Sequence, residues 1–477
     1  MSTEESSLPL CSAPYPIAAF DFDDVLQLIL TRVATGADLM GCLLVSRRWY
    51  AAALPVLYRH PLLASPQALC AFVIVLRQHP LRSAFLSSLS FAVPPGQPSW
   101  LRDKDLATLF AALRRSDSPS LNVRHVSFKG CRGITGRSLQ HLPLLFPSLT
   151  SVDLQGCVGI SSSLPIMLVR SLRDLSRLIL SASCAVPLCD LPALMTPKMQ
   201  DLDVVIHHSP YSSIAWLMHP PMPPSHSTDT QPRALQRLAL TRQEIITNQG
   251  MLPDEALTSL LRMNPTITDL DLRWNAQLTW CSLRDIVLCS GLQRLSLDFC
   301  SQLCDDTLLH IGRGCQRLRH LSLSHCRLIT DAGISYAAQT LRSLETIDMD
   351  GIAHLTDTAA AVWTAHDHIR GISMARCPNL TNRSLLALAQ VRNLCTLNIA
   401  DCPQISWPQA PEPPTCCFRA LRTITVDAKA HTVENALGIL SKCPALETIV
   451  VKGRMGTRPN LSSLRNGSLS RVAVEYI

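Results

Sequence analysis

The sequence lacks the features that would place it in a membrane, outside the cell or on nucleic acid. Its longest apolar run, Ala68–Leu76, is far shorter than the roughly 18 residues that a membrane-spanning helix needs. The first residues, MSTEESS, are acidic and polar, unlike a secretory signal or a mitochondrial transit peptide. Basic runs reach only two residues, as at Arg47-Arg48, and the net charge is a mild +7. We therefore expect no membrane partner and no nucleic-acid partner.

Signals for chemistry are also missing. Without an export signal, the 19 cysteines are expected to be reduced thiols in the cytosol or the nucleus. Metal sites need close pairs with matching spacing, and Cys184…Cys189 and Cys416-Cys417 do not form such a set. There is no phosphate-cradling glycine loop, no nucleophile elbow and no metalloprotease helix. The sequence predicts no metal, no cofactor and no catalytic residue.

What the chain does have is apolar surface to bury. Hydrophobic residues make up 47% and charged residues only 17%, which is too apolar for a disordered chain. The spacing Leu-x-x-Leu-x-Leu, with other large apolar residues substituting, recurs fifteen times. The repeats begin at Leu86, Val123, Leu149, Leu175, Met199, Leu235, Ile267, Leu292, Leu318, Leu344, Ile369, Leu394, Leu421, Leu446 and Leu469. From Leu292 onward the intervals are 26, 26, 25, 25, 27, 25 and 23 residues, within the range of leucine-rich repeats.

A second signal lies inside each interval, counted as an offset from the first apolar residue of the repeat. Offset 8 is a small side chain in seven repeats: Cys131, Cys157, Asn275, Cys300, Cys326, Cys377 and Cys402. Offset 12 carries a hydroxyl in eight: Thr135, Ser161, Thr247, Thr279, Thr330, Thr356, Thr381 and Ser406. Cysteine behaves as a small buried hydrophobe, and a hydroxyl is a good N-cap for a helix.

These offsets predict one strand and one returning helix per repeat. Offsets 3 and 5 lie on the same side of a strand and face the core. Asp331 to Leu341 then carries Ile334, Ala337 and Ala338 on one helical face. A unit of this size cannot bury its own apolar face, so we predict an α/β solenoid that is curved, with parallel strands on the concave side.

The repeat resembles the cysteine-containing leucine-rich repeat. The stretches LRHLSLSHCRLITDAGI (318–334) and LQRLSLDFCSQLCDDTL (292–308) are close to that consensus, and residues 123–161 and 235–406 follow it best. Two Pro-rich insertions, at about 207–233 and 403–419, are expected to be loops.

Residues 17–60 precede the repeats and differ from them. Val25, Leu26, Ile29 and Leu30 fall at helical spacing, and a second helix is expected after a break at Thr35-Gly36. A module of this size has too small a core to bury all of its apolar residues, so we expect it to dock against a partner or the solenoid.

This module resembles an F-box, on the sequences DDVLQLILTRV and DLMGCLLVSRRWY. The exit LPVLYRHPLL (54–63) is similar to that of fungal F-boxes. Asp21-Phe22 stands where the family has Leu-Pro. The resemblance implies binding to a Skp-type adaptor, and through it to a cullin/RING ligase. The expected contact residues form an exposed apolar face: Phe22, Val25, Leu26, Ile29, Leu39, Val45 and Trp49. The other interpretation is that these residues are the module's own core.

Side chains at offsets 2, 4 and 6 are expected to face the concave groove. In the central repeats these positions are mostly acidic: Asp201, Asp203, Asp269, Asp271, Asp298, Asp348 and Asp350, against Arg237, Arg273 and Arg294. One hypothesis is a groove that prefers a basic substrate segment. The alternative is that these are ordinary carboxylates paired with neighbouring arginines.

An F-box followed by such repeats is typical of substrate-recognition subunits of SCF ubiquitin ligases. The resemblance therefore implies a non-catalytic receptor in the cytoplasm or nucleus, with a tail at 1–16, the F-box-like module at 17–60, a linker and irregular first repeat at 61–122, and the solenoid at 123–477. Two alternatives remain. The first is a scaffold or inhibitor with a degenerate F-box, and the second is a GTPase-activating repeat protein that uses an exposed arginine.

Overall fold

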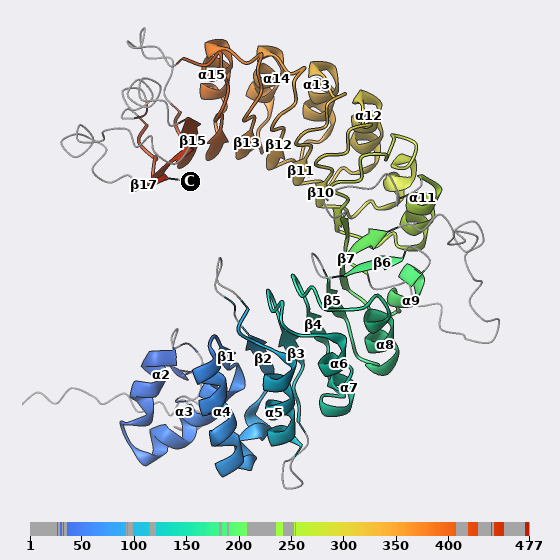
Figure 1. The fold of residues 1–477 in the computed structure, drawn as a ribbon. Helices are drawn as coiled ribbons and strands as arrows, with labels where there is room; N and C mark the ends of the chain where they lie inside the picture. Colours follow the sequence, from blue (N-terminus) through green and yellow to red (C-terminus); the bar gives the residue numbers. More distant parts are fainter. Residues whose placement is uncertain are drawn as a thin grey trace, which may run out of the picture.

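The chain forms a curved solenoid with strands lining its inner side and helices covering its outer side (Figure 1). The computed structural model describes residues 26, 29, 30, 32, 36–91, 93, 99–114, 121–180, 184–187, 190–207, 235–241, 252, 254–406, 418–427, 440, 443–452 and 473–476. The N-terminal tail and most of both Pro-rich insertions lie outside these residues. The predicted α/β solenoid with a small helical module in front of it is confirmed.

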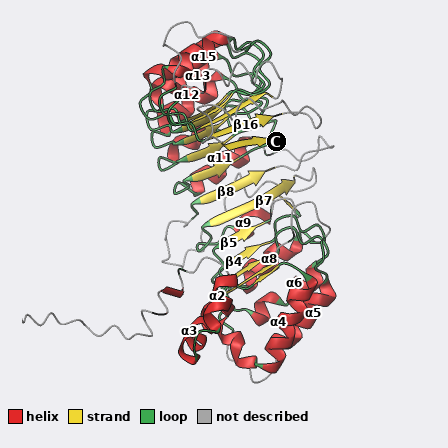
Figure 2. Ribbon diagram, turned by 90° about the vertical axis from the view of Figure 1, so that its left-hand side faces the viewer, coloured by secondary structure: helices red, strands yellow, loops and turns green. Residues whose placement is uncertain are grey.

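The described strands form one 17-stranded sheet whose pairings are all parallel. They follow one another in chain order, as Figure 2 shows for β4, β5, β7 and β8, except that β6 pairs only with β7. Their bounds are β1 Leu62–Leu63, β2 Ser88–Phe91, β3 His125–Ser127, β4 Ser151–Asp153, β5 Arg177–Ile179, β6 Ala185–Pro187, β7 Asp201–His207, β8 Arg237–Thr241, β9 Asp269–Asp271, β10 Arg294–Ser296, β11 His320–Ser322, β12 Thr346–Asp348, β13 Gly371–Ser373, β14 Thr396–Asn398, β15 Thr423–Asp427, β16 Thr448–Lys452 and β17 Ala473–Tyr476.

The helices of the repeats lie on the convex side, and two more precede the first strand (Figure 1). Their bounds are α2 Gly36–Leu43, α3 Arg47–Arg59, α4 Pro66–Gln78, η1 Pro80–Phe85, α5 Asp103–Leu113, α6 Gly136–Leu139, α7 Leu142–Leu145, α8 Ser163–Ser171, α9 Leu191–Leu194, α11 Asp254–Met263, η3 Arg284–Leu288, α12 Asp305–Gly314, α13 Asp331–Thr340, α14 Asp357–Ala361, η4 Val362–Ala365 and α15 Asn382–Ala389. The η elements are 3₁₀-helices, which tighten the convex side of their repeats.

The strand register explains the apolar ladder. Offset 3 of one repeat pairs with offset 3 of the next, as Leu295 pairs with Leu321 and Leu321 with Ile347. These residues and those at offset 5 are almost fully buried in one core that extends from Leu63 to Val451. Each repeat thus contributes the same layer to a continuous core, as a solenoid requires.

The cysteines at offset 8 do more than fill space. Each is buried, and the Sγ of Cys326 donates a hydrogen bond to the carbonyl oxygen of Leu297 in the preceding repeat at 3.1 Å. Cys377 does the same with Met349 at 3.4 Å. Burial raises the pKa of the Cys377 thiol to about 12, so these thiols stay protonated donors. Every described cysteine is a free thiol, as the sequence predicts.

Four of the threonines at offset 12 are helix N-caps, and they also join neighbouring repeats: Thr135, Thr330, Thr356 and Thr381. The prediction is wrong for Ser161, since α8 is capped by Ser162, and no described helix begins directly after Thr279, while Thr247 lies outside the described residues. Thr330 accepts a hydrogen bond from the backbone N–H of Ala332 in its own helix α13. Its hydroxyl donates to the carboxylate of Asp305 in the preceding repeat at 2.7 Å, and its backbone N–H does so at 2.9 Å. The hydroxyl and the backbone N–H of Thr356 donate in the same way to the carboxylate of Asp331. In the repeat that begins at Leu292, offset 12 is Cys304 instead of a hydroxyl residue, and α12 begins there without a side-chain capping hydrogen bond.

Three parts of the sequence prediction are corrected. The segment 61–122, predicted as a linker and irregular repeat, contains α4 and α5, and its strand β1 already pairs with β2. Strand β6 was not expected between β5 and β7. In the last rung Ala473 pairs with Thr448, so this rung begins two residues later than Leu469 predicts.

Candidate functional site

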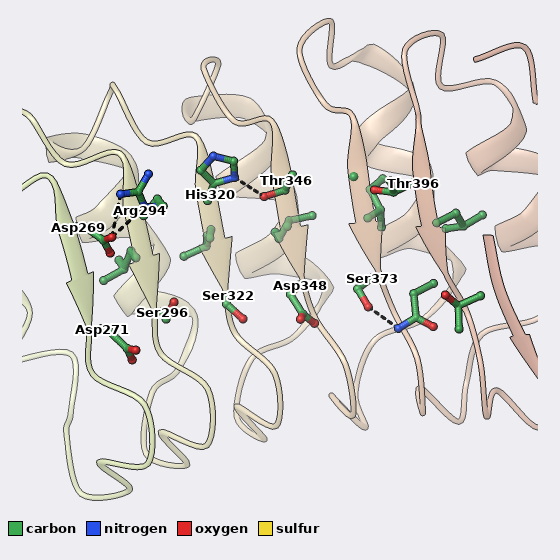
Figure 3. A pocket seen from close by; sticks show the side chains of 18 of the residues that line it. Asp269, Asp271, Arg294, Ser296, His320, Ser322, Thr346, Asp348, Ser373 and Thr396 are labelled. Atoms are coloured by element: carbon green, nitrogen blue, oxygen red, sulfur yellow. Dashed lines mark hydrogen bonds and ion pairs between the residues drawn. The ribbon is translucent and has the colours of Figure 1, made fainter. Parts of the chain in front are cut away.

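The concave side of the sheet carries a groove of about 520 Å³ between β8 and β15 (Figure 3). Its polar lining comes from offsets 2 and 4, because these side chains alternate with the buried offset 3. We call these positions the groove floor: Arg237, Asp269, Asp271, Arg294, Ser296, His320, Ser322, Thr346, Asp348, Gly371, Ser373, Thr396, Asn398, Thr423 and Thr425. Offsets 2 and 4 therefore face the groove, as predicted.

The acidic residues at the β7–β9 end of the sheet are paired with arginines. Arg237 lies within 3.2 Å of Asp201, 3.9 Å of Asp203 and 3.4 Å of Asp269. Arg294 also contacts Asp269, at 2.9 Å.

Two further ion pairs lie at the same end of the sheet. Arg177, which the sequence analysis did not include, lies 2.9 Å from Asp201, and Arg273 forms a two-pronged contact with Asp271 at 2.7–3.0 Å. Four carboxylates thus face four guanidinium groups, so this end of the sheet has little net charge. These pairs are partly exposed, and each stabilises the fold by about 1 kcal/mol at most.

The carboxylates at offset 6 do not line the groove. Asp298 accepts two hydrogen bonds from the next repeat. One comes from the backbone N–H of Ser324, at 2.9 Å, and the other from Ser322 Oγ. Asp350 is 8% exposed and accepts from Ser373 Oγ at 2.6 Å and the N–H of Ala375 at 2.7 Å. The prediction that offset 6 faces the groove is wrong for these two residues. Strands such as β10 end at offset 4, and the alternation of side chains ends with them.

The remaining acidic residue of the floor is Asp348. Its Oδ1 accepts from Ser324 Oγ at 2.6 Å and from the N–H of Asp350 at 3.1 Å. Burial, and next the charge of Asp348, raise the pKa of the Asp350 carboxyl. Burial likewise raises the pKa of Asp298. An acidic groove is therefore reduced to a single floor carboxylate, Asp348, because Asp298 and Asp350 are turned to backbone N–H groups of the next repeat.

From β11 to β15 the groove floor is mainly hydroxyl and amide groups. His320 Nδ1 lies 2.7 Å from Thr346 Oγ1, and Asn398 Nδ2 donates to Ser373 Oγ at 2.9 Å (Figure 3). The sequence analysis missed these residues because it selected charged side chains. The offsets alone would have found them, since they occupy the same positions as Asp269 and Asp271.

The helical module has a small core of its own. Leu26 and Leu39 are 2% and 8% exposed and pack with Leu30, Ala52 and Ala53, so both belong to this core and not to an exposed face. Trp49 packs against the same core and is half-buried.

Two of the predicted contact residues are exposed. Ile29 is 50% and Val45 62% exposed, and they are accompanied by Met40 at 53% and Leu44 at 89%. Leu44 and Val45 form the turn between α2 and α3. Phe22 and Val25 lie outside the described residues. The module therefore offers an apolar surface, centred on the α2–α3 turn.

The module is joined to the solenoid without a free linker. The chain passes from α3 through Arg59 and Pro61 into β1, and both residues accept backbone hydrogen bonds, from Ser87 and Ser90. The guanidinium group of Arg82 donates to the hydroxyls of Tyr58 and Tyr50 on α3, at 3.2 and 3.1 Å.

Other kinds of site were sought in the same residues. Among the described residues no group of three or more His, Cys, Asp or Glu side chains is placed to hold a metal ion. None of the described helices has the length and apolar character needed to cross a bilayer.

Fold and site together define the class of protein: a leucine-rich-repeat solenoid with a concave groove and a helical N-terminal module. The family described as Leucine Rich repeat matches residues 314–336. Over 90 residues the chain is 38% identical to the F-box/LRR-repeat MAX2 homolog of Oryza sativa subsp. japonica; this match covers 18% of the chain and only 12% of the relative. A chain in the crystal structure of the Rad7 and Elc1 complex in yeast is 16% identical, with a TM-score of 0.51 over 95% of this chain and 92% of that one.

These findings show the fold and a partial likeness. The chain has the leucine-rich-repeat fold, and over one stretch of 90 residues it is similar to an F-box/leucine-rich-repeat protein. The low identity to the yeast structure makes that likeness one of fold alone.

Proposed function

We propose that the chain is a non-catalytic substrate receptor of an SCF-type ubiquitin ligase. The observation that carries the proposal is the apolar α2–α3 turn, with Leu44 at 89% exposure, on a module fixed to the end of a long binding solenoid. Exposed apolar side chains of this kind mark protein-binding surfaces. In this proposal the turn binds a Skp-type adaptor, and the chemistry of ubiquitin transfer belongs to the conjugating enzyme that the complex recruits.

The receptor acts by proximity, since a substrate held in the groove is presented to the conjugating enzyme at high effective concentration. The similar solved fold occurs in a complex of Rad7 with Elc1, which supports a role within an assembly.

For the groove we propose an extended protein segment with small polar side chains. The hydroxyl and amide groups from His320 to Thr425 suit such a segment. A single basic side chain would be placed opposite Asp348, the floor carboxylate without an arginine partner among the described residues. This is a narrower version of the basic-segment hypothesis, because the other floor carboxylates are already paired.

The second candidate is a scaffold or inhibitor whose degenerate F-box binds no adaptor. The departure Asp21-Phe22 at the start of the module favours it.

Co-purification with a Skp-type adaptor separates the two. The wild-type chain should capture the adaptor, and Leu44→Asp/Val45→Asp should abolish capture, because a buried carboxylate in an apolar contact is costly. These positions are better than Leu26, whose substitution would unfold the module's core. Leu144→Asp is the control, since Leu144 is 78% exposed on α7 of the solenoid. Failure of the wild type to bind would leave the scaffold function.

A further inference from the structure

The residue after offset 6 forms a straight row along the edge of the groove at the carboxyl ends of the strands. We call it the rim row: Trp274, Phe299, His325, Gly351, Arg376 and Asp401. Each lies at positive φ, between 56° and 69°. The backbone N–H of each of the first five donates to the offset 6 carbonyl of the next repeat, for example from Phe299 to Ser324 at 2.8 Å and from His325 to Asp350 at 2.7 Å. A backbone hydrogen bond to the next repeat therefore fixes the position of each of these five residues.

Three aromatic rings of the rim row are stacked. The ring centroids of Trp274 and Phe299 are 3.7 Å apart with planes 5° from parallel, and those of Phe299 and His325 are 4.4 Å apart at 20°. A Cβ atom on Gly351 would lie 2.4 Å from the His325 ring, so the ring occupies the space beside this glycine. Non-glycine residues seldom adopt positive φ, and large rings are rarer still there.

The three rings are half-exposed, and stacking covers the faces that they turn toward one another, so their edges contribute to the exposed surface. The edge of an aromatic ring carries partial positive charge, whereas its face carries negative charge. The column therefore presents an apolar surface whose electrostatic preference is for an anion.

The basic side chains around the ring column also favour an anion. Arg327 and Arg376 are exposed, and neither has an ion-pair partner in the described part of the chain, unlike Arg237 and Arg294 of the groove floor. Arg376 stands in the rim row itself, and Arg327 follows His325 by two residues in the chain. After burial, the charges of these arginines lower the pKa of His325, whereas the charge of Asp348 raises it.

The nearby acidic groups offset this charge only in part. Asp298 and Asp350 are turned inward to backbone N–H groups, and Asp348 belongs to the groove floor. Asp401, next along the row after Arg376, is the exposed one.

We propose that the rim row between Phe299 and Arg376 binds an acidic segment of a protein partner. Carboxylates on one side of the extended segment pair with Arg327 and Arg376, and the apolar side chains, which alternate to its other side, lie against the edges of the ring column. Guanidinium groups bind carboxylates through two parallel hydrogen bonds, which gives the contact direction as well as strength. Three rung spacings of about 4.8 Å match roughly five extended residues. The site is distinct from the adaptor surface and does not depend on the proposed ligase function.

The test uses the full chain and fluorescein-labelled peptides of roughly eight residues in which Glu alternates with Leu. Peptides with Gln or Lys in place of Glu, and one with phosphoserine, are compared by fluorescence anisotropy. The Glu peptide should bind best. Arg327→Gln/Arg376→Gln should weaken it by about tenfold or more, and added salt should weaken it in the wild type.

The chain supplies its own control. Lys129 and Arg132 are exposed on the same edge near the N-terminus, where the row contains Gly130 and Gly156 in place of rings. Lys129→Gln/Arg132→Gln makes the same charge change and should leave binding unaltered. Equal loss in both double variants, or equal binding of the Glu and Gln peptides, would overturn the proposal, as would capture of the phosphoserine peptide alone.

A second variant tests the rings separately. Phe299→Gly removes the middle ring of the column. Glycine tolerates the positive φ at this position, as Gly130 does at its own. It should weaken the Glu peptide by about threefold or more with the arginines intact. Unchanged binding in a variant whose circular dichroism matches the wild type would show that the column has no part in the site.

Discussion

At the scale of single residues, neighbouring repeats are joined by hydrogen bonds that the sequence pattern predicts only in part. The hydroxyl at offset 12 was expected as a helix cap, and in four repeats it serves as one. Its second contact, to the carboxylate one repeat earlier, makes Asp305, Asp331 and Asp357 part of the same ladder. Although burial acts in the other direction, hydrogen bonds from Ser384 and Thr381 hold the pKa of Asp357 below its usual value.

Thr356→Val tests this contact. The substitution removes the donor to Asp331 and the acceptor for the N–H of Thr358, and should lower the free energy of unfolding by about 1–2 kcal/mol. The urea midpoint measures the loss. Thr396→Val, at an exposed floor position, is the control and should change stability little.

Asp350→Asn tests the buried carboxyl. Because the folded-state pKa is raised, the folded chain holds this proton more tightly than the unfolded chain, and stability falls as the pH rises above the ordinary value near 4. Asparagine keeps an oxygen for Ser373 and Ala375 without the charge. Its urea midpoint should exceed the wild type's at pH 7, and the difference should disappear near pH 4. Asp401→Asn, at an exposed carboxyl, is the control and should leave the urea midpoint at pH 7 unchanged.

At the scale of elements, the short strand decides which side chains face the groove. Every strand from β9 to β14 has three residues, covering offsets 2 to 4. Beyond them the chain turns through the positive-φ residue at offset 7, and this turn directs Asp298 and Asp350 toward the backbone of the next repeat. The two-residue alternation of a strand therefore applies to a shorter segment than the sequence suggested.

Gly351→Ala measures what this turn tolerates. Alanine would be strained at φ +67° and would displace the His325 ring, at a cost of about 1–3 kcal/mol in unfolding free energy. Gly130→Ala has the same backbone conformation, but its Cβ would meet only Val93 at 3.6 Å. Urea unfolding of both variants should show the larger loss for Gly351→Ala; equal losses would mean that the ring moves freely.

At the scale of the whole molecule, the module and the solenoid share a structural joint. Strand β1 extends the sheet, and Arg82 joins η1 to α3 through Tyr50 and Tyr58, with its guanidinium carbon 5.5 Å from the centre of the Tyr58 ring. Because each repeat contacts only its neighbours, the orientation of the module depends on this joint alone.

Arg82→Ala should loosen the joint. Amide hydrogen exchange should become faster in the end of α3 and in β1, while β10 to β15 remain as protected as in the wild type. Arg132→Ala, in the next part of the solenoid, is the control. If β1 exchanges at the wild-type rate in Arg82→Ala, the sheet pairing holds the module without the arginine.

The sequence by itself determined the solenoid, most of its rung positions and the N-caps of four helices, because these depend on local spacing that repeats along the chain. The residue at offset 3 must be buried in every repeat if it is buried in one. Fifteen matches to the same spacing, each weak by itself, therefore predict the solenoid together. Cys326 and Thr330 could be assigned from their offsets for the same reason.

Only the tertiary structure decided what those side chains meet. Leu26 and Leu39 are core because helices packed across the module cover them, while Leu44 in the turn is not covered. The β7–β9 end of the sheet has little net charge because Arg177 and Arg237, far in sequence from their partner Asp201, stand one strand away from it in the sheet. The ring column exists because the backbone turn places one residue of each repeat directly over that of the next. Contacts between repeats depend on which side chains are stacked side by side, and residue spacing within one repeat contains no information about them.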